Sequence, residues 1–216
     1  DSPKLAKVKS NIKVIVKPFS LVDYEYWNQY GISLTTLQFF NVKAVSHVYL
    51  NKRDKHYVFE YKNSNPLYSY KFFKNNTEYF KIYNPYSPTK EGKWLSNVGS
   101  DCLAGYDQLP PTGDLLILTK SMKDTMSYFE LGYNAISFQA ETNKISKKSW
   151  NELSKRFKRI VLNFDNDDAG REATDKFLLE YPINCYFIDG GCKDLSDYIH
   201  KHGLKKAEKL IKNKLL

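Results

Sequence analysis

The stretch FDNDDAG, residues 164–170, decides the fold, because it joins the end of an apolar strand to the start of a helix. We expect the strand over 159–164 and the helix over 168–179. Residues two apart in extended backbone point to the same side, so Asp165 and Asp167 can both reach one cation. Asp168 is expected to be the N-cap of the helix.

Strands and helices alternate around this stretch. The expected strands are 115–119, 134–138, 159–164 and 184–188, and the expected helices are 121–131, 146–157, 168–179 and 194–202. This alternation predicts an α/β fold, a parallel sheet with helices on both faces. A last amphipathic helix, LKKAEKLIKNKLL, is expected to pack on this core within 201–216.

The first half of the chain has a different pattern. Helical spacing is seen over Asp23 to Tyr30 and again from Ser33, and β-branched or aromatic runs of period two follow from Val42 to Tyr83. We expect a smaller α+β subdomain with an antiparallel meander. The prolines and glycines of GYDQLPPTGD predict a boundary near 110–113, which gives domains 1–112, 113–200 and 201–216.

Composition narrows the class of protein. The 216 residues carry a net charge of +9, which favours a polyanionic partner, although a lysine-rich surface can also serve only solubility. There is no apolar run of about 18 residues and no signal peptide, so no membrane contact is expected. Cys102, Cys185 and Cys192 lack zinc-ligand spacing, so we expect no zinc and a cytoplasmic location. The chain begins at Asp1 and is expected to be a piece of a longer protein.

Acidic residues recur where the predicted strands end, the edge at which open α/β sheets bind ligands. Asp124 follows the first strand, Glu141 the second, and Asp194 and Asp197 the fourth. Carboxylates gathered in this way repel one another unless a cation lies between them, and Mg²⁺ prefers such ligands. The predicted metal ligands are Asp165, Asp167, Asp194 and Asp197. Helix capping is the alternative role of Asp124 in a capping box and of Asp194 with Asp197.

FDNDDAG resembles the DxD motif of toprim domains, which bacterial and phage primases, topoisomerases and some nucleases share. LLILTKSMKDTMSYFELGYNAISF (115–138) resembles the opening of that domain, and GGCKDLSDYI (190–199) resembles its closing acidic segment. The resemblance covers residues 113–200. It implies a toprim fold and a Mg²⁺ or Mn²⁺ cofactor.

The first motif departs from the family, which ordinarily has Glu where this sequence has Lys120 and Gly where it has Ser121. The family's Glu is usually assigned acid/base work or metal binding. Lys120 could bind a nucleotide phosphate as a point charge, and Glu141 could supply the displaced carboxylate. The predicted catalytic residues are therefore Asp124, Asp165, Asp167, Lys120 and Glu141.

Segments of the first half resemble the subdomain that precedes toprim in bacterial-type primase cores. These segments are YWNQYGISLTTLQFFNV (26–42), KIYNP (81–85), KEGKWLSN (90–97) and GYDQLP (105–110). The resemblance implies a basic groove for single-stranded DNA, with aromatic rings that stack on bases. By position, the candidates are Lys71, Lys81, Lys90, Lys93, Trp94 and Tyr83, with Tyr86 as a further ring. Solvated lysines and core aromatics are the alternative.

The function that the resemblance implies is a phage-type DNA primase core for DNA replication. Such a nucleotidyltransferase makes short RNA primers from ribonucleoside triphosphates on single-stranded DNA in a bacterial or phage-infected cell. A replicative helicase and a zinc-binding module outside these residues would be its partners. Two alternatives stay open: a toprim nuclease, and a catalytically inactive nucleic-acid-binding module, which Lys120 favours.

Overall fold

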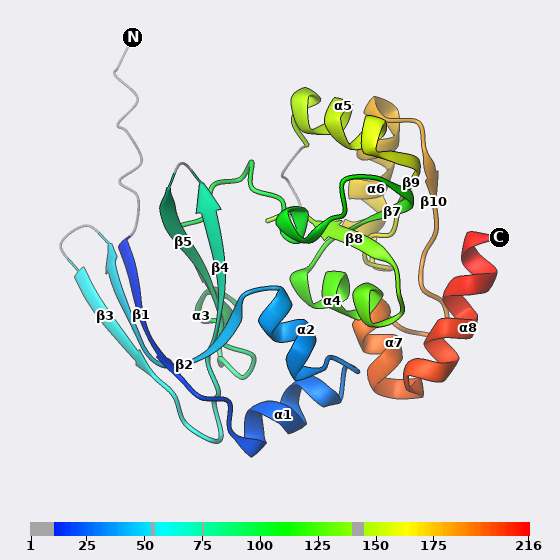
Figure 1. Cartoon of the computed structure of the whole chain (residues 1–216). Coiled ribbons are helices and arrows are strands. Elements are labelled where there is room, and N and C mark those ends of the chain that lie inside the picture. Colours follow the sequence, from blue (N-terminus) through cyan, green and yellow to red (C-terminus); the bar gives the residue numbers. More distant parts are fainter. Residues whose placement is uncertain (1–10, 53–54, 75, 140–144) are drawn as a thin grey trace, which may run out of the picture. The chain divides into compact units, whose positions relative to one another are not determined.

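The structure is a computed structural model that describes residues 11–52, 55–74, 76–139 and 145–216, and the chain is drawn in Figure 1. It divides into two compact units. The first unit runs up to Asp23 and continues over Asn41–Val98, and the second comprises Tyr24–Phe40 and Gly99–Leu216. The domain limits 1–112, 113–200 and 201–216 remain predictions from the sequence.

The segment Tyr24–Phe40 belongs to the second unit because it contacts residues that lie far from it in the sequence. The rings of Phe39 and Phe40 lie 4.9 and 5.3 Å from that of Phe129. The Ser33 amide donates to the Glu130 carboxylate at 2.6 Å. These contacts could not be deduced from the local pattern, which marks only the proline-rich turn.

The first unit is built on an antiparallel sheet. Its strands are β1 (Asn11–Lys17), β2 (Val42–Lys52), β3 (Lys55–Glu60), β4 (Tyr68–Lys74), β5 (Thr77–Tyr83) and β6 (Trp94–Ser96), and a short helix, α3 (Lys90–Lys93), precedes β6. The order is β1-β2-β4-β5-β6, with β3 also paired to β2. The predicted antiparallel sheet is confirmed, with one step that differs from a simple meander. β2 is long enough for β4 to pair with Val42–Ala44 and β3 with His47–Lys52.

A buried carboxylate fixes the end of β1 in this unit. Asp23 is fully buried and accepts hydrogen bonds from Lys17 Nζ (2.7 Å), the Ser20 amide (2.8 Å), Ser20 Oγ (2.7 Å) and Tyr61 Oη (3.2 Å). Burial opposes ionisation, but the hydrogen bonds of Lys17 and Ser20 prevail and lower the pKa of Asp23. The charged carboxylate is therefore a structural part of this unit.

The second unit contains a parallel sheet in the order β10-β9-β7-β8. Its strands are β7 (Gly113–Thr119), β8 (Asn134–Ser137), β9 (Phe157–Leu162) and β10 (Asn184–Cys185). Its helices are α1 (Leu21–Asn28, shared with the end of the first unit), α2 (Leu34–Phe39), α4 (Met122–Glu130), α5 (Lys147–Arg156), α6 (Asp168–Glu180), α7 (Leu195–His202) and α8 (Leu204–Leu215), with a 3₁₀ turn at Tyr106–Gln108.

Helices cover both faces of this sheet, as predicted (Figure 1). On one face, Leu116, Leu118 and Leu162 pack with α5 and α6. On the other, Ile117 and Val161 pack with α4, α7 and α8. Adjacent residues of β7 thus face opposite cores, which explains why its sequence is continuously apolar. Among the described residues, no helix combines the length and apolar character needed to cross a membrane.

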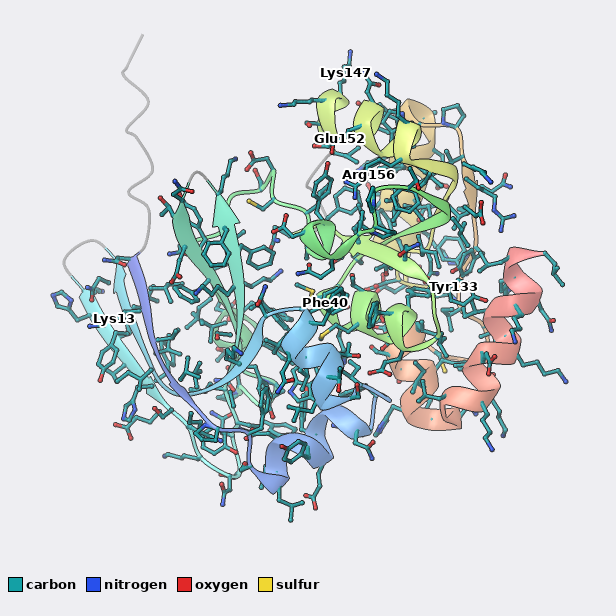
Figure 2. The ribbon with its side chains drawn as sticks, viewed as in Figure 1. Lys13, Phe40, Tyr133, Lys147, Glu152 and Arg156 are labelled. Atoms are coloured by element: carbon teal, nitrogen blue, oxygen red, sulfur yellow. The ribbon has the colours of Figure 1, made fainter. Side chains whose placement is uncertain are left out.

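The predicted boundary segment is held against α5. Arg156, one turn from Glu152 in Figure 2, donates through Nη2 to the carbonyls of Leu109 (3.2 Å) and Pro110 (2.8 Å). Its Nη1 lies 3.5 Å from Glu152 Oε1. The proline-rich turn is therefore part of the second unit and leads directly into β7.

Candidate metal centre

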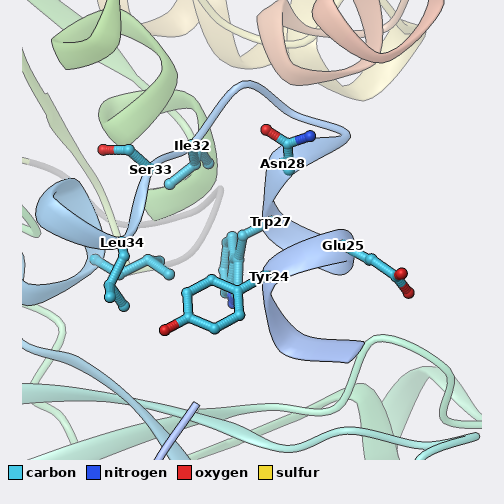
Figure 3. Close-up of a pocket in the computed structure, with 8 residues that line it drawn as sticks. Tyr24, Glu25, Trp27, Asn28, Ile32, Ser33 and Leu34 are labelled. Carbon is cyan, nitrogen blue, oxygen red and sulfur yellow. The ribbon is translucent and has the colours of Figure 1, made fainter. Parts of the chain in front are cut away.

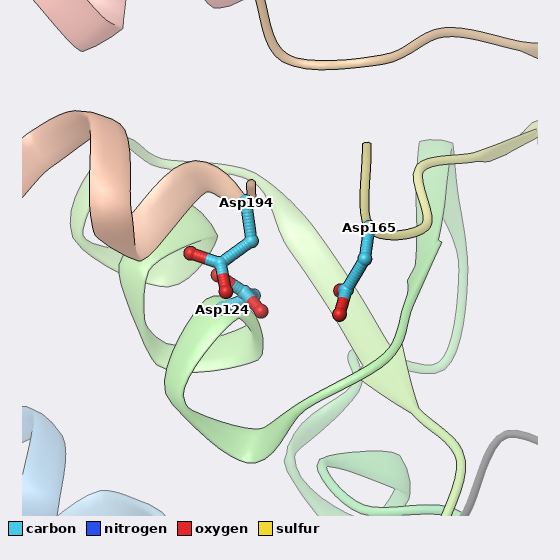
Figure 4. A group of neighbouring side chains, drawn as sticks. All are labelled: Asp124, Asp165 and Asp194. Carbon is cyan, nitrogen blue, oxygen red and sulfur yellow. The ribbon is translucent and has the colours of Figure 1, made fainter. Parts of the chain in front are cut away.

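Three carboxylates converge in the second unit. Asp124, Asp165 and Asp194 each present an oxygen, and these oxygens all lie within 4.8 Å of one another (Figure 4). We call these residues the carboxylate triad. Asp124 comes from the first turn of α4, Asp165 follows β9, and Asp194 precedes α7. The parallel strand order brings these connections to the carboxyl edge of the sheet.

Asp124 is the most deeply buried member, with 1% of its surface exposed. Ser121 Oγ donates to Asp124 Oδ2 at 2.5 Å, and the Ser196 amide donates to Oδ1 at 3.0 Å. Ser121 is also the N-cap of α4, accepting from the Asp124 amide at 3.0 Å. Burial, and then the charge of Asp194, raises the pKa of Asp124 to about 7. Ser121 thus caps α4, and Asp124 both contacts this cap and belongs to the triad.

Asp194 also combines the two roles that the sequence left open. As the N-cap of α7 its Oδ1 accepts from the Asp197 amide and from Ser196 Oγ, each at 2.7 Å. These bonds fix the carboxyl group while an oxygen still lies within the triad. Asp197 is directed elsewhere, since its Oδ2 accepts from the Lys193 amide and from Lys201 Nζ, each at 3.0 Å.

Asp165 is placed by a tight turn between β9 and α6. Its side chain is largely buried, and burial raises its pKa, while Lys120 and Lys193 oppose the rise. A Cβ added at Gly170 would lie 2.0 Å from the Asp165 carbonyl oxygen. Glycine at this position therefore allows the first turn of α6 to approach the residue that enters the triad.

Asp167 lies beside the triad and has other partners. It is the N-cap of α6, and its Oδ1 accepts from the Gly170 amide at 2.8 Å, so the expectation that Asp168 caps this helix is wrong. Lys193 Nζ lies 2.8 Å from Asp167 Oδ2 and 3.1 Å from Asp165 Oδ2. The hydrogen bond from Lys193 lowers the pKa of Asp167. Lys193 thus joins Asp165 and Asp167, two of the three aspartates of FDNDDAG.

Lys193 and Ser196 contact the carboxylate triad but are not among the residues predicted from the sequence. Both lie within the segment GGCKDLSDYI, next to the predicted ligand Asp194. The signal available in the sequence was this proximity: a lysine directly before one acidic ligand is carried to the same strand edge as the others. Away from the carboxylates, Tyr128 Oη donates to Asn163 Oδ1 (2.5 Å) and accepts from Tyr186 Oη (2.9 Å). These bonds connect α4 to the segment that follows β9.

The remaining predicted catalytic residues are placed as follows. Lys120 directly follows β7, and its amino group is buried. Its charge opposes the burial that raises the pKa of Asp165, and it adds to the effect of Lys193 in lowering the pKa of Asp167. Its ammonium group therefore lies in the electrostatic field of this centre. Glu141 falls outside the described residues.

The donor set suits a hard divalent cation. Mg²⁺ and Ca²⁺ take oxygen ligands at about 2.0–2.6 Å, which spaces oxygens about 3–5 Å apart around one ion. A separation of up to 4.8 Å is compatible with this range. Burial and the charge of Asp194 both oppose ionisation of Asp124, and a bound cation would favour it. The triad therefore fits a cation better than Asp167 or Asp197, whose carboxylate oxygens are bonded to protein groups.

The predicted template-binding residues lie in the first unit, where an aromatic stack runs along β4, β5 and β6. Trp94, 37% exposed, stacks its ring on that of buried Tyr83 at 4.4 Å, and Lys81 Nζ lies 4.9 Å from the Trp94 ring centroid. Burial lowers the pKa of Lys81 to about 8. Lys71 pairs with Glu78 at 2.5 Å.

The other predicted template-binding residues, Lys90, Lys93 and Tyr86, lie in or near α3. Lys93 ends α3 and is exposed, and Tyr86 is 56% exposed. Lys90 begins α3, and its side chain lies outside the described set.

A separate cavity of about 230 Å³ lies between α1 and α2 (Figure 3). Apolar side chains such as Trp27, Ile32 and Leu37 line it together with one carboxylate, Glu25. It contains no member of the carboxylate triad, so it contributes nothing to the metal centre.

Comparison with known proteins agrees with this geometry. Residues 117–199 match the sequence profile of the Toprim-like family. This part of the chain is a toprim-like domain, and it contains all three residues of the triad. A search of curated protein sequences finds no significant match.

The chain has the fold of primase catalytic cores over most of its length. The primase fragment of the bacteriophage T7 primase-helicase protein superposes with a TM-score of 0.60 at 19% identity, over 96% of this chain and 76% of that one. The E. coli primase catalytic core gives 0.64 at 14% identity, over 90% and 73%. A DnaG primase catalytic domain bound to single-stranded DNA gives 0.64 at 13% identity, over 91% and 73%.

Proposed function

We propose that this chain is the catalytic core of a primase-type nucleotidyltransferase, which joins ribonucleotides into short RNA primers on single-stranded DNA. One observation carries the proposal: three carboxylates converge within 4.8 Å at the strand edge of a toprim-like domain, in a chain with the fold of primase cores. The fold alone would be compatible with many activities, so the carboxylate geometry is what supports a metal-dependent reaction at a phosphate group.

Asp124, Asp165 and Asp194 would hold Mg²⁺ or Mn²⁺, and such an ion would neutralise the charge that develops on a nucleotide triphosphate. Ser121, Ser196 and the α7 amide groups hold two of these carboxylates in place before any ligand binds. Little reorganisation would then be needed on binding, which is what electrostatic preorganisation requires. Lys120 would add a positive charge for a substrate phosphate.

The first unit would bind the template. Trp94 offers an exposed ring, and Lys81 and Lys93 lie on or next to the same part of the sheet. Stacking combined with positive charge suits single-stranded DNA without sequence preference. A helicase and a zinc-binding module outside this chain remain part of the proposal. The T7 relative, whose protein is a primase-helicase, supports the helicase.

Product analysis tests the proposal directly. The chain is incubated with single-stranded DNA, labelled ribonucleoside triphosphates and Mg²⁺ or Mn²⁺, and the products are separated by size. We expect short labelled RNA from the wild type and none from Asp165→Asn. Asp114→Asn is the matched control, because Asp114 is exposed on β7 and pairs only at the surface with Lys158 (2.7 Å).

Two other outcomes would replace the proposal. Cleaved DNA without RNA synthesis would assign a toprim nuclease that uses the same carboxylates. DNA retention without either product, with both metals, would assign a nucleic-acid-binding module whose activity was lost with the motif Glu at Lys120.

A further inference from the structure

Lys193 has an unusual position in the candidate centre. Its amino group lies 3.1 Å from Asp165 Oδ2 and 2.8 Å from Asp167 Oδ2, so one ammonium group bridges these two aspartates of FDNDDAG. A divalent ion shared by two carboxylates would need to occupy the same space. The lysine thus neutralises part of the negative charge that would otherwise attract a second cation.

The backbone of Lys193 is firmly held while its side chain reaches solvent. Its carbonyl accepts from the Asn166 amide at 2.7 Å, and its amide donates to Asp197 Oδ2 at 3.0 Å. The side chain is nevertheless 52% exposed. A fixed backbone with an accessible flexible amine allows the amino group to leave the aspartates without disturbing the neighbouring Asp194.

The two aspartates that it bridges are not equivalent. Asp165 also contributes to the carboxylate triad, whereas Asp167 uses Oδ1 to cap α6 and Oδ2 to bind Lys193. Removing Lys193 would therefore release Asp167 Oδ2 while the cap remains. The released oxygen and Asp165 would then form a pair open to a hard cation.

We propose that Lys193 is a built-in counter-cation: the free protein binds one divalent ion at the carboxylate triad, and the Lys193 amino group excludes a second ion from the Asp165–Asp167 pair. Resting on the proposed function, the inference adds a role for Lys193 in catalysis. When a triphosphate binds, its anionic oxygens compete for the ammonium group, which turns toward them and opens the pair. Lys193 is thus a positioning residue that couples nucleotide binding to the ion content of the site.

Counting bound Mn²⁺ tests this inference without any activity assay. Electron paramagnetic resonance and calorimetric titration of the whole chain give the number of ions bound. We expect one ion for the wild type and two for Lys193→Met and Lys193→Gln. Lys176→Met is the matched control, because Lys176 forms an exposed pair with Glu172 on α6 and should leave the number at one.

A double variant makes the test specific to Asp167. Asp167→Asn keeps an N-cap acceptor for α6, so the fold should be retained. On its own it should still bind one ion, and combined with Lys193→Met it should return the number from two to one. The inference is overturned if the Lys193 variants bind one ion with unchanged affinity, or if Asp167→Asn alone loses the ion.

The outcomes also separate this inference from the proposed function. If the wild type binds no Mn²⁺, the metal centre itself is wrong, and both fall together. If the wild type binds one ion and the Lys193 variants also bind one, only the role of Lys193 is wrong. Primer synthesis by the wild type would in that case be unaffected.

Discussion

Asp124→Asn should stabilise the metal-free protein at alkaline pH. Asp124 is almost completely buried, and its pKa is raised from 3.8 to about 7, chiefly by that burial. Each pKa unit corresponds to about 1.4 kcal/mol, so ionising this group in the folded protein costs roughly 4 kcal/mol. Asparagine removes the charge and keeps an oxygen for the Ser196 amide.

The sign of the pH dependence follows from the raised pKa. Below about pH 4 the Asp124 carboxyl group is neutral in both the folded and the unfolded chain, so its ionisation does not lower the free energy of unfolding. As the pH rises from about 4 to 7, the unfolded chain loses the proton first, and the wild type loses stability relative to the variant. Above about pH 7 the difference should stay constant at roughly 4 kcal/mol.

Urea unfolding in EDTA at pH 4.5, 6 and 8 measures this difference, because subtracting variant from wild type cancels the other titrating groups. Asp114→Asn, at an exposed position, should show no comparable trend. A flat difference across this pH range, or a wild type more stable than the variant at pH 8, would refute the argument that Asp124 carries uncompensated buried charge. Saturating Mn²⁺ should stabilise the wild type and have little effect on Asp124→Asn.

Three further predictions follow from packing and charge. Gly170→Ala should destabilise the protein by about 1–3 kcal/mol in urea unfolding and weaken Mn²⁺ binding, because the added Cβ displaces the Asp165 carbonyl. Asp23→Ala should lower the free energy of unfolding by about 3–5 kcal/mol, because it leaves Lys17 without its buried partner. Because the pKa of Asp23 is lowered, this residue is protonated only at pH values below about 4, and the wild type should lose stability there. Trp94→Ala should weaken binding of a fluorescent oligothymidine by about 1–3 kcal/mol in an anisotropy titration.

Each of these has a control and a contrary result. Ala169→Ser, at the exposed position beside the glycine, should be neutral, and a stable Gly170→Ala with full Mn²⁺ affinity would contradict the close approach. Asp23→Ala as stable as the wild type would mean that the buried pair contributes nothing. Tyr57→Ala, an exposed ring on β3, should retain oligothymidine affinity, and equal affinity of Trp94→Ala would remove the stacking proposal.

Much of the fold could be predicted because local patterns and global topology agree. The continuous apolar run of β7 is typical of a strand buried on both faces, and the regular alternation of strands and helices indicates the parallel sheet. The pairing of both β3 and β4 with β2 could not be predicted. It depends on the length of β2, which pairs with β4 near its start and with β3 near its end.

The candidate site shows the same division. Strand ends could be located in the sequence, so Asp165 and Asp194 could be named as neighbours. The direction of each side chain could not be predicted. It depends on whether the carboxylate accepts hydrogen bonds from a backbone amide or a lysine, as it does at Asp167 and Asp197. Only the folded geometry distinguishes Asp124, buried inside the triad, from an ordinary residue of a capping box.

The most direct test of the metal centre is anomalous diffraction from a crystal of the wild-type protein soaked in Mn²⁺. The central claim is that a divalent cation binds between Asp124, Asp165 and Asp194. We expect an anomalous peak within about 2–2.5 Å of an oxygen of each carboxylate. A well-diffracting soaked crystal with no peak there, or with manganese only at other surface carboxylates, would contradict it.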